Sequence, residues 1–298
     1  MSQVDRRGFI KGAVGLSTVV TTGMTARGSS KQVMVKPLAA RGGFPAAMIG
    51  NREMSRMLIG GNPFSGISHS EPLLYPSRVF KQYFTHEKVV ETLSICVQNG
   101  INTFLGRIDE NVIGFLKLYE KTYGERMPWI AQTSAKAEKG ATKQQIQDNI
   151  RVAADNGAMG CYVQGQSADF LVAKGNVGHI EEHVALMRKL GMLGGIGAHV
   201  NKTIEETAKA GLKPDFYMKT INRLGYNAVE SDRTAQIMAT VEAPWIAFKV
   251  LGAGRIDPEE GFAYALKAGA DFLCVGMFDF QVEDNVKLAR KLMSEMPT

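Results

Sequence analysis

From Ser55 onward, short apolar segments alternate with longer segments in which apolar residues recur every three or four positions. The short segments are typical of buried strands and the longer ones of amphipathic helices. Eight strands are expected, over Met57–Gly60, Asn102–Leu105, Trp129–Gln132, Gly160–Gln164, Gly194–His199, Asp215–Lys219, Trp245–Leu251 and Phe272–Val275. A helix follows each strand, over His86–Gln98, Asn111–Tyr123, Lys143–Asn156, Ile180–Leu190, Ile204–Ala210, Asp232–Val241, Pro258–Lys267 and Val282–Met293.

Eight consecutive strand–helix units predict an α/β protein with the (β/α)8 architecture, the TIM barrel, over residues 55–298. The units occupy roughly 240 residues, which is the usual length of this fold. A doubly wound sheet is the alternative, but the first predicted strand runs into Gly60-Gly61-Asn62-Pro63 and not into a GxGxxG loop. Residues 27–54 are expected to form a linker and an N-terminal extension. The long segment Asn62–Thr85 is expected to form a lid over the C-terminal ends of the strands, the mouth of the barrel.

The charge of the chain is concentrated at its N-terminus. Of 35 Lys and Arg and 29 Asp and Glu, residues 1–41 hold seven basic residues and one acidic residue, which leaves 28 of each in the remainder. A neutral folded part gives no support for a nucleic-acid partner. No segment reaches the roughly 20 apolar residues that a membrane span needs, so no stable span is expected.

The segment Asp5–Lys11 contains the pair Arg6-Arg7, and a weakly apolar run follows to Ala26. This pattern resembles a twin-arginine export signal. The resemblance implies that residues 1–26 are read by the export machinery and that the protein is periplasmic or extracellular. A disordered basic tail is the alternative.

The cysteines and histidines give little indication of a metal or disulfide site. Three cysteines without motif spacing argue against a disulfide framework, and Cys96, Cys161 and Cys274 are expected to be small core residues. A divalent metal site is not expected either, because only His199 among the possible ligands follows a strand well. The pair His179 and His183, four residues apart on a helix, is expected to lie at the surface.

Polar side chains gather at the ends of the predicted strands. Alternate residues of a barrel strand face the helices and the interior. If the apolar set faces the helices, as Cys161 and Val163 would, the other set faces inward. The residues that this rule turns inward, or that follow a strand end directly, are Asn62, Arg107, Gln132, Tyr162, Gln164, His199, Tyr217, Lys219 and Lys249.

Catalytic sites of this fold lie at the mouth, so these residues predict an enzyme. The strand ends supply few carboxylates, and a cationic mouth suits a carboxylate, a phosphate or a carbonyl that gains negative charge. The expected catalytic residues are Lys219, Lys249, His199, Tyr217 and Tyr162, and the expected substrate contacts are Asn62, Arg107, Gln132 and Gln164. The alternative is a polar plug in which the two lysines pair with carboxylates inside the barrel.

Two chemistries fit these residues. A buried lysine with a lowered pKa can attack a carbonyl and form a Schiff base, and Lys219 and Lys249 on adjacent strands meet that requirement. Tyrosine, lysine and histidine can equally protonate a carbonyl oxygen during hydride transfer. The residues by themselves leave both chemistries open.

The last two strands each run into a glycine turn, in Phe248–Arg255 and Phe272–Met277. Glycines at consecutive strand ends let backbone N–H groups approach an anion, as in barrels that bind phosphate. The predicted anion site comprises Gly252, Gly254, Arg255 and Gly276. The alternative is that the glycines only tighten the turns.

Two segments, Gly100–Phe104 and Lys249–Asn285, resemble the aldo/keto reductases. The resemblance implies a TIM barrel that binds a nicotinamide dinucleotide, NAD(P), with Gln281 and Asn285 added to the four residues of the glycine turns. The catalytic positions of that family are not matched, because Leu105 stands where its aspartate would be and its lysine falls near Ser134.

These observations predict an exported TIM-barrel enzyme that acts on a small carbonyl or anionic substrate, such as a sugar-derived one. Nicotinamide-linked reduction is favoured because of the resemblance and the export signal. A Schiff-base lyase or aldolase that uses Lys219 or Lys249 is the first alternative. A non-catalytic barrel that binds an anion or a sugar is the second.

Overall fold

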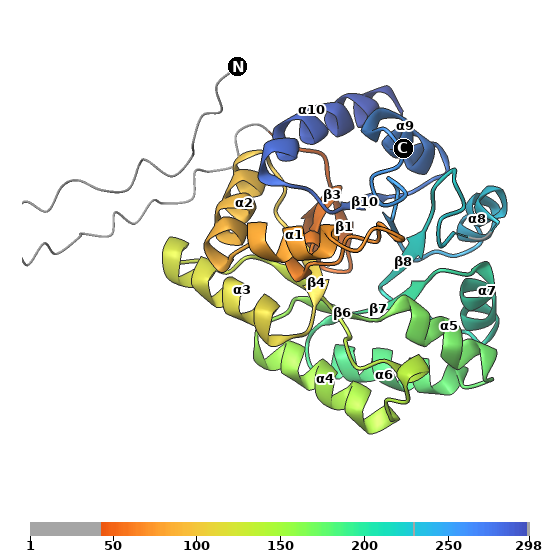
Figure 1. The fold of residues 1–298 in the computed structure, drawn as a ribbon. Coiled ribbons are helices and arrows are strands. Elements are labelled where there is room, and N and C mark those ends of the chain that lie inside the picture. The colour runs from red at the N-terminus through yellow and green to blue at the C-terminus, as the bar shows by residue number, and fades with distance from the viewer. Residues whose placement is uncertain (1–42, 229, 297–298) are drawn as a thin grey trace, which may run out of the picture. The chain divides into compact units, whose positions relative to one another are not determined.

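The computed structural model describes residues 43–228 and 230–296, so the predicted signal and residues 27–42 of the linker lie outside the described part. Eight parallel strands close into a barrel in the order β10-β3-β4-β5-β6-β7-β8-β9 (Figure 1). This confirms the TIM barrel. The strands are β3 (Met57–Gly60), β4 (Phe104–Arg107), β5 (Trp129–Gln132), β6 (Gly160–Val163), β7 (Leu193–Ala198), β8 (Phe216–Thr220), β9 (Trp245–Phe248) and β10 (Phe272–Val275).

Helices surround the barrel, and each predicted helix is present with its ends shifted by three residues or fewer (Figure 1). Two α-helices were not predicted, α1 and α5. The helices are α1 (Pro76–Tyr83), α2 (His86–Gln98), α3 (Glu110–Tyr123), α4 (Lys143–Asp155), α5 (Gly165–Ala173), α6 (Val177–Lys189), α7 (Asn201–Lys209), α8 (Ser231–Met238), α9 (Pro258–Lys267) and α10 (Asp279–Glu295). Two short 3-10 helices are η1 (Pro63–Ser65) and η2 (Ala137–Lys139).

Several helices begin where a polar side chain accepts a hydrogen bond from a free backbone N–H group. Asp109 accepts from the N–H of Val112 at the start of α3, and Thr142 and Gln145 form a reciprocal capping box at the start of α4. These caps fix where α3 and α4 begin after β4 and β5.

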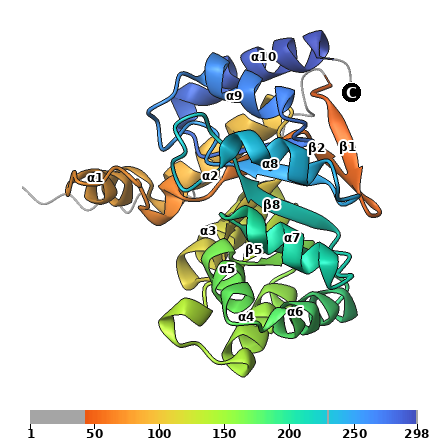
Figure 2. The same ribbon diagram turned by 90° about the vertical axis from the view of Figure 1, so that its right-hand side faces the viewer.

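The C-terminal part of the predicted linker forms an antiparallel hairpin of β1 (Ala46–Ile49) and β2 (Arg52–Ser55). Ile49 and Met54 of this hairpin are fully buried with the side chains that fill the barrel interior. Figure 2 shows the hairpin at one end of the barrel and α1 at the other. The hairpin therefore closes the bottom, and the mouth lies on the side of α1.

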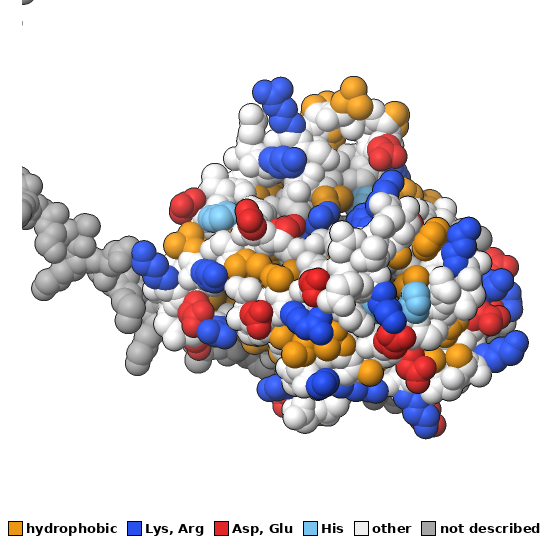
Figure 3. Space-filling view, turned by 90° about the horizontal axis from the view of Figure 1, so that it is seen from below, with side chains coloured by type: hydrophobic (Ala, Val, Ile, Leu, Met, Phe, Trp, Pro, Cys, Tyr) orange, Lys and Arg blue, Asp and Glu red, His pale blue; other side chains and the backbone are white. Residues whose placement is uncertain are grey.

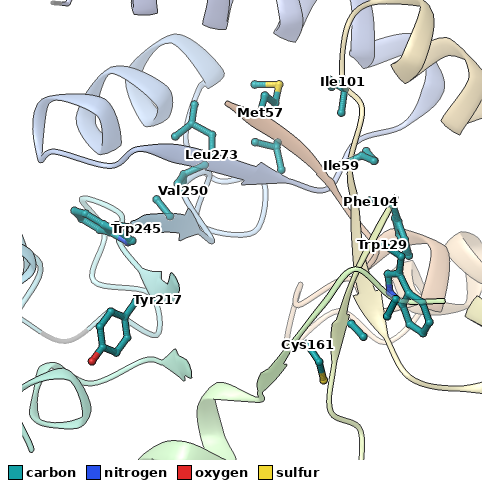
Figure 4. Close-up of a cluster of buried hydrophobic side chains, with 14 of the residues drawn as sticks. Met57, Ile59, Ile101, Phe104, Trp129, Cys161, Tyr217, Trp245, Val250 and Leu273 are labelled. Carbon is teal, nitrogen blue, oxygen red and sulfur yellow. The ribbon is translucent and has the colours of Figure 1, made fainter. Parts of the chain in front are cut away.

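The side chains of the barrel strands form two separate hydrophobic clusters. The inner cluster fills the barrel and includes Leu58, Leu105, Ile130, Tyr162, Leu193, Phe216, Met218, Ile246, Phe272 and Cys274. The outer cluster lies between the strands and the helices, where Figure 4 shows Met57, Trp129, Cys161, Tyr217 and Leu273 pointing away from the barrel axis. Both faces of the strands are thus apolar below the mouth, as expected for a parallel sheet buried on both sides.

The segment before α2 projects from the mouth (Figure 2). No residue of α1 is buried, and the loop before it exposes Leu73, Leu74 and Tyr75. The expected lid role of Asn62–Thr85 remains a prediction.

The predictions for cysteines and histidines have different outcomes. Cys96, Cys161 and Cys274 are free and buried, as predicted. His183 was predicted at the surface with His179, but its side chain is fully buried and neither ring nitrogen has a hydrogen-bond partner. The prediction was wrong because His183 lies on the buried face of α6, together with Ile180, Val184 and Met187.

Two further features of the described residues are relevant to partners. Within residues 43–228 and 230–296, no helix has the length and apolar character needed to cross a bilayer. On the face shown in Figure 3, Lys and Arg side chains lie among Asp and Glu side chains without a continuous field of one sign. That face has no basic surface of the kind that binds nucleic acid.

Candidate active site

The inward direction predicted for the middle strands is confirmed. Cys161, Val163, Ile196 and Ala198 belong to the outer cluster, so the residues between them face the interior. The polar side chains on this inner set, or directly beyond a strand end in register with it, are Asn62, Arg107, Gln132, Tyr162, Gln164 and His199. Arg107 lies beside Gln132 across β4 and β5, and Gln132 lies beside Tyr162 across β5 and β6.

The inward direction predicted for Tyr217 and Lys219 was wrong. Phe216, Met218 and Ile246 fill the interior, and Tyr217 packs in the outer cluster, where its hydroxyl lies 3.1 Å from the Thr207 hydroxyl. The rule failed because apolar residues occupy both faces of these strands. Tyr217 therefore lies away from the mouth.

Tyr162 faces inward but lies within the inner cluster, below the polar side chains of the strand ends. Its burial raises the phenol pKa well above 10.0. A hydroxyl that holds its proton this strongly in an apolar environment fits a packing role.

Lys219 is fully buried at the end of β8, in register with Ala198 and Ala247 of the outer cluster. Its Nζ donates to the carbonyl oxygens of His199, at 3.0 Å, and Thr220, at 3.1 Å. Burial lowers the lysine pKa to about 8, and the carboxylate of Asp169 opposes that shift. Lys219 therefore ties the ends of β7 and β8 together.

Lys249 follows β9 and has a left-handed backbone, with φ of 58°. This conformation is uncommon for a residue other than glycine, and it ends the strand at Phe248 instead of the predicted Leu251. The Lys249 side chain is half-buried, and its Nζ lies 5.4 Å from the centre of the Tyr226 ring. Burial lowers its pKa to about 8. No carboxylate among the described residues forms an ion pair with it.

His69, in the loop after β3, brings this loop into the same part of the mouth. Its Nε2 lies 3.2 Å from the amide nitrogen of Asn62, and its carbonyl oxygen accepts from the Tyr226 hydroxyl at 3.4 Å. Burial, together with the smaller effect of the fields of Lys249, His199, Lys136 and Arg255, lowers the pKa of His69 to about 4. All four of these neighbours are basic side chains, and two of them have carboxylate partners, Glu138 for Lys136 and Asp169 for His199.

Left-handed backbone at residues other than glycine is confined, among the described residues, to three loops at the mouth: His69, Asn227, Glu230, Lys249 and Ala253. Such conformations cost about 1 kcal/mol or more each and are often found at functional sites. The loops concerned are those after β3, β8 and β9, which also meet through Tyr226.

His199, directly after β7, is paired with a carboxylate. Its Nδ1 lies 3.1 Å from Oδ2 of Asp169 on α5, and both groups have little exposed surface. The Asp169 carboxylate also accepts from the backbone N–H of His199 and from the Thr203 hydroxyl at 2.6 Å. The arrangement can hold an imidazole for proton transfer.

The predicted substrate contacts differ in what else they do. Arg107 Nε is buried 3.2 Å from Oδ2 of Asp109 and makes no hydrogen bond of good geometry, while the side chain as a whole is one-third exposed. Gln132 is partly exposed beside it. The side chain of Gln164 instead accepts from the N–H of Ser167 and caps α5.

The residues predicted to bind a nicotinamide dinucleotide do not fit that group. The N–H of Gly252 donates to the Lys249 carbonyl at 2.9 Å, which supports the alternative that this glycine tightens a turn; Gly254 also has a positive φ, of 79°. The Arg255 guanidinium donates to the carbonyls of Gly252 and His69. Its donors hold loops together.

The polar groups that follow the second glycine turn also bond within the protein. Gly276 leads to α10, where Gln281 accepts from the N–H of Phe278 and caps the helix, and Asn285 is buried. Asp279 places a carboxylate at the N-terminus of α10, bonded to Tyr83 and Lys88. A dinucleotide phosphate at this helix end would meet negative charge.

Sequence reasoning missed Asp169, and it gave no role to His69 or Tyr226. Asp169 lies on α5, whose first residues Gly165-Gln166-Ser167 give no helical signal. Among residues 43–228 and 230–296, no three His, Cys, Asp or Glu side chains lie close enough to hold a metal ion.

Many solved structures have a similar fold. A protein assigned as an aldo-keto reductase from Pseudomonas aeruginosa has a TM-score of 0.61 and 13% identity, over 83% of this chain and 96% of that chain. A truncated 3-deoxy-D-arabino-heptulosonate 7-phosphate synthase from Thermotoga maritima has a TM-score of 0.53 and 11% identity, over 85% and 93%. No family model and no curated protein sequence matches the chain. The likeness establishes the fold: the chain is a TIM-barrel protein.

Proposed function

We propose that the protein is an enzyme that forms a Schiff base between Lys249 and a small carbonyl substrate that carries a negative charge. The observation that carries the proposal is the state of the Lys249 amine, which is half-buried, has a pKa of about 8 and lacks a carboxylate partner among the described residues. At pH 7 about a tenth of such amines are unprotonated, roughly 300 times the fraction for a lysine with an ordinary pKa. The unprotonated amine is the nucleophile.

The reaction begins when the lone pair of Lys249 Nζ forms a C–N bond to the carbonyl carbon and the carbonyl oxygen takes up a proton. The nitrogen then gives up one proton, which restores its lone pair. The hydroxyl takes up a second proton and leaves as water, while the nitrogen lone pair forms the C=N bond of an iminium ion. The iminium then accepts the electron pair of an adjacent C–H or C–C bond as that bond breaks. The proton of a C–H bond passes to Nε2 of His199; a C–C bond breaks when a hydroxyl on the departing carbon loses its proton, so that this carbon leaves as a carbonyl compound. His199 is suited to move the protons, because Asp169 holds its Nδ1 and Nε2 has no partner among the described residues.

The charge of the mouth supports an anionic substrate. Lys249, Lys136, Arg255 and His199 are close enough to His69 for their fields to lower its pKa. Arg107, which pairs with Asp109, adds a guanidinium at the end of β4, three strands from β9 in the barrel. A carboxylate or phosphate on the substrate would be attracted to these groups and would bring the carbonyl to the Lys249 amine.

Nicotinamide-linked reduction, which the sequence favoured, has less support in this geometry. The backbone and side-chain donors expected to hold the dinucleotide already bond within the protein, and Tyr217 lies outside the barrel. We also propose that the protein is exported through the predicted twin-arginine signal. This part of the proposal rests only on the sequence of residues 1–26.

The proposal is tested by trapping with borohydride. The purified protein is incubated with a panel of 2-oxo acids, hydroxyaldehydes and their phosphorylated forms, and the iminium is reduced to a stable secondary amine. Peptide mapping by mass spectrometry is expected to locate the adduct on Lys249. Lys249→Arg is expected to retain the fold and to give no adduct.

Lys136→Arg is the matched control, because Lys136 also lies near His69 but its amine is 3.9 Å from the Glu138 carboxylate. This variant is expected to form the adduct as readily as the unaltered protein. An adduct at a lysine other than Lys249, or anion binding without any adduct across the panel, would overturn the proposal. The second result would favour a binding protein.

A further inference from the structure

His199 is held at three of its four polar atoms. Its backbone N–H and its ring Nδ1 both lie within hydrogen-bond distance of the Asp169 carboxylate, at 3.0 Å and 3.1 Å to Oδ2. Its carbonyl oxygen accepts from Lys219 Nζ at 3.0 Å and from the Thr220 hydroxyl at 3.1 Å. Only Nε2 is left without a partner among the described residues.

The bonds to Asp169 determine which ring nitrogen carries the proton. An ionised carboxylate can only accept hydrogen bonds, so Nδ1 must donate and must carry a hydrogen. In the neutral ring Nε2 then has a free lone pair. The Thr203 hydroxyl donates to Oδ1 of Asp169 at 2.6 Å and keeps the carboxylate in this orientation.

The plane of the ring is fixed by packing. The Phe248 ring lies edge-on to the imidazole at 5.5 Å between ring centres. On another side the imidazole lies against Gly165, where an added Cβ would be 2.7 Å from Cε1 of His199. The close approach requires glycine at this position, because a methyl group would displace the ring.

We propose that His199 is the proton-transfer group of the site through Nε2, and that Asp169 and Lys219 are positioning residues that fix its tautomer and its backbone. This proposal rests on the proposed function, because the Schiff-base reaction determines which protons His199 would move. Lys219, which the sequence presented as a nucleophile, has a different role here, because its amine is fully buried and its donors are directed to the carbonyls of His199 and Thr220.

The first test reads the tautomer of His199 in the ligand-free protein by 15N NMR, with His199→Gln identifying the signal among the five histidines. We expect the Nδ1–H tautomer in the unaltered protein. In Asp169→Asn the carboxylate is replaced by an amide with one acceptor oxygen, and the Nε2–H tautomer is expected to appear. Finding Nε2–H in the unaltered protein, or no change in Asp169→Asn, would contradict the proposal.

The second test follows proton transfer. With the carbonyl compound that gives the Lys249 adduct, exchange of the adjacent C–H hydrogens with D2O is expected to slow by about 100-fold or more in Asp169→Asn. Thr203→Val keeps the carboxylate and its bond to Nδ1, so it should slow exchange by less than about 10-fold. The rate is expected to fall without loss of the adduct.

Gly165→Ala provides an independent variant in case Asp169→Asn does not fold. Its methyl group moves the ring but leaves Asp169 and Lys249 in place, so exchange is expected to slow while adduct formation persists. Unchanged exchange in Gly165→Ala would contradict the role of His199. The tautomer test needs no substrate, so a failure of Schiff-base chemistry is distinguishable from a failure of this inference.

Discussion

Lys219 and Lys249 stand at the ends of neighbouring strands, and burial lowers the pKa of each to about 8. Lys219 is fully buried and its amine donates to two backbone carbonyls. Lys249 is half-buried over the Tyr226 ring, on a left-handed backbone, and no carboxylate among the described residues pairs with its amine. A lowered pKa therefore accompanies a structural role in one lysine and a proposed chemical role in the other, and hydrogen-bond partners separate the two.

The difference between the two lysines is tested most strongly by removing each amine in turn. Lys249→Met should raise the free energy of unfolding at pH 7 by about 1 to 2 kcal/mol, after allowance for solvent screening of a half-buried charge. Lys219→Met relieves a similar desolvation cost but leaves two buried backbone carbonyls without a donor, so its net effect should be to lower the free energy of unfolding by about 1 to 2 kcal/mol. Denaturant unfolding of both variants measures the difference, which we expect to be about 3 kcal/mol.

The pH dependence of the free energy of unfolding tests whether the charged Lys249 amine destabilises the folded protein. The folded-state pKa of Lys249, about 8, is below the unfolded value of 10.5, so the unfolded chain binds more protons between these values. The free energy of unfolding should therefore rise with pH across that window. In Lys249→Met it should rise less than in the unaltered protein, because the variant lacks this titrating amine. Equal effects of the two lysine substitutions would remove the distinction between them.

His183 extends the comparison to a buried titratable group on α6, without a hydrogen-bond partner at either ring nitrogen. Burial lowers its pKa to about 4 from 6.5, so the unfolded chain binds more protons between these values and stability falls as the pH drops through them. Between pH 6.5 and pH 5 the loss should be about 1.5 kcal/mol. His183→Leu should reduce that loss without changing adduct formation at Lys249, as measured by denaturant unfolding at several pH values.

The smallest expected effect concerns Tyr217, which the alternation of the sequence had placed beside the lysines. Tyr217→Phe removes the contact with the Thr207 hydroxyl and should cost about 1 kcal/mol of stability. Because the ring packs in the outer cluster, adduct formation should be unchanged. A large loss of adduct in this variant would mean that Tyr217 reaches the mouth after all.

The fold could be predicted from the sequence because each strand–helix unit carries its own local signal. The predicted bounds of β3, β5, β10, α2 and α9 agree with the structure. Capping side chains and apolar periodicity are properties of neighbouring residues, and both are visible in the sequence.

The candidate site was harder to predict because it depends on features that the apolar pattern does not encode. Alternation fails where both faces of a strand are apolar, as around Phe216 and Tyr217. The left-handed backbone of Lys249 has no signal of its own beyond the glycines that follow it. The pairing of Asp169 with His199 joins residues 30 positions apart across α5 and β7.

The central claim, that Lys249 is the reactive amine and Lys219 is a structural one, is tested most directly by their rates of modification. Formaldehyde and cyanoborohydride methylate accessible, unprotonated amines, and mass spectrometry gives the rate at each lysine as a function of pH. The account predicts that Lys249 reacts with a midpoint near pH 8 and that Lys219 is protected in the folded protein. Faster modification of Lys219, or a Lys249 that reacts only near the pH of an ordinary lysine, would contradict it.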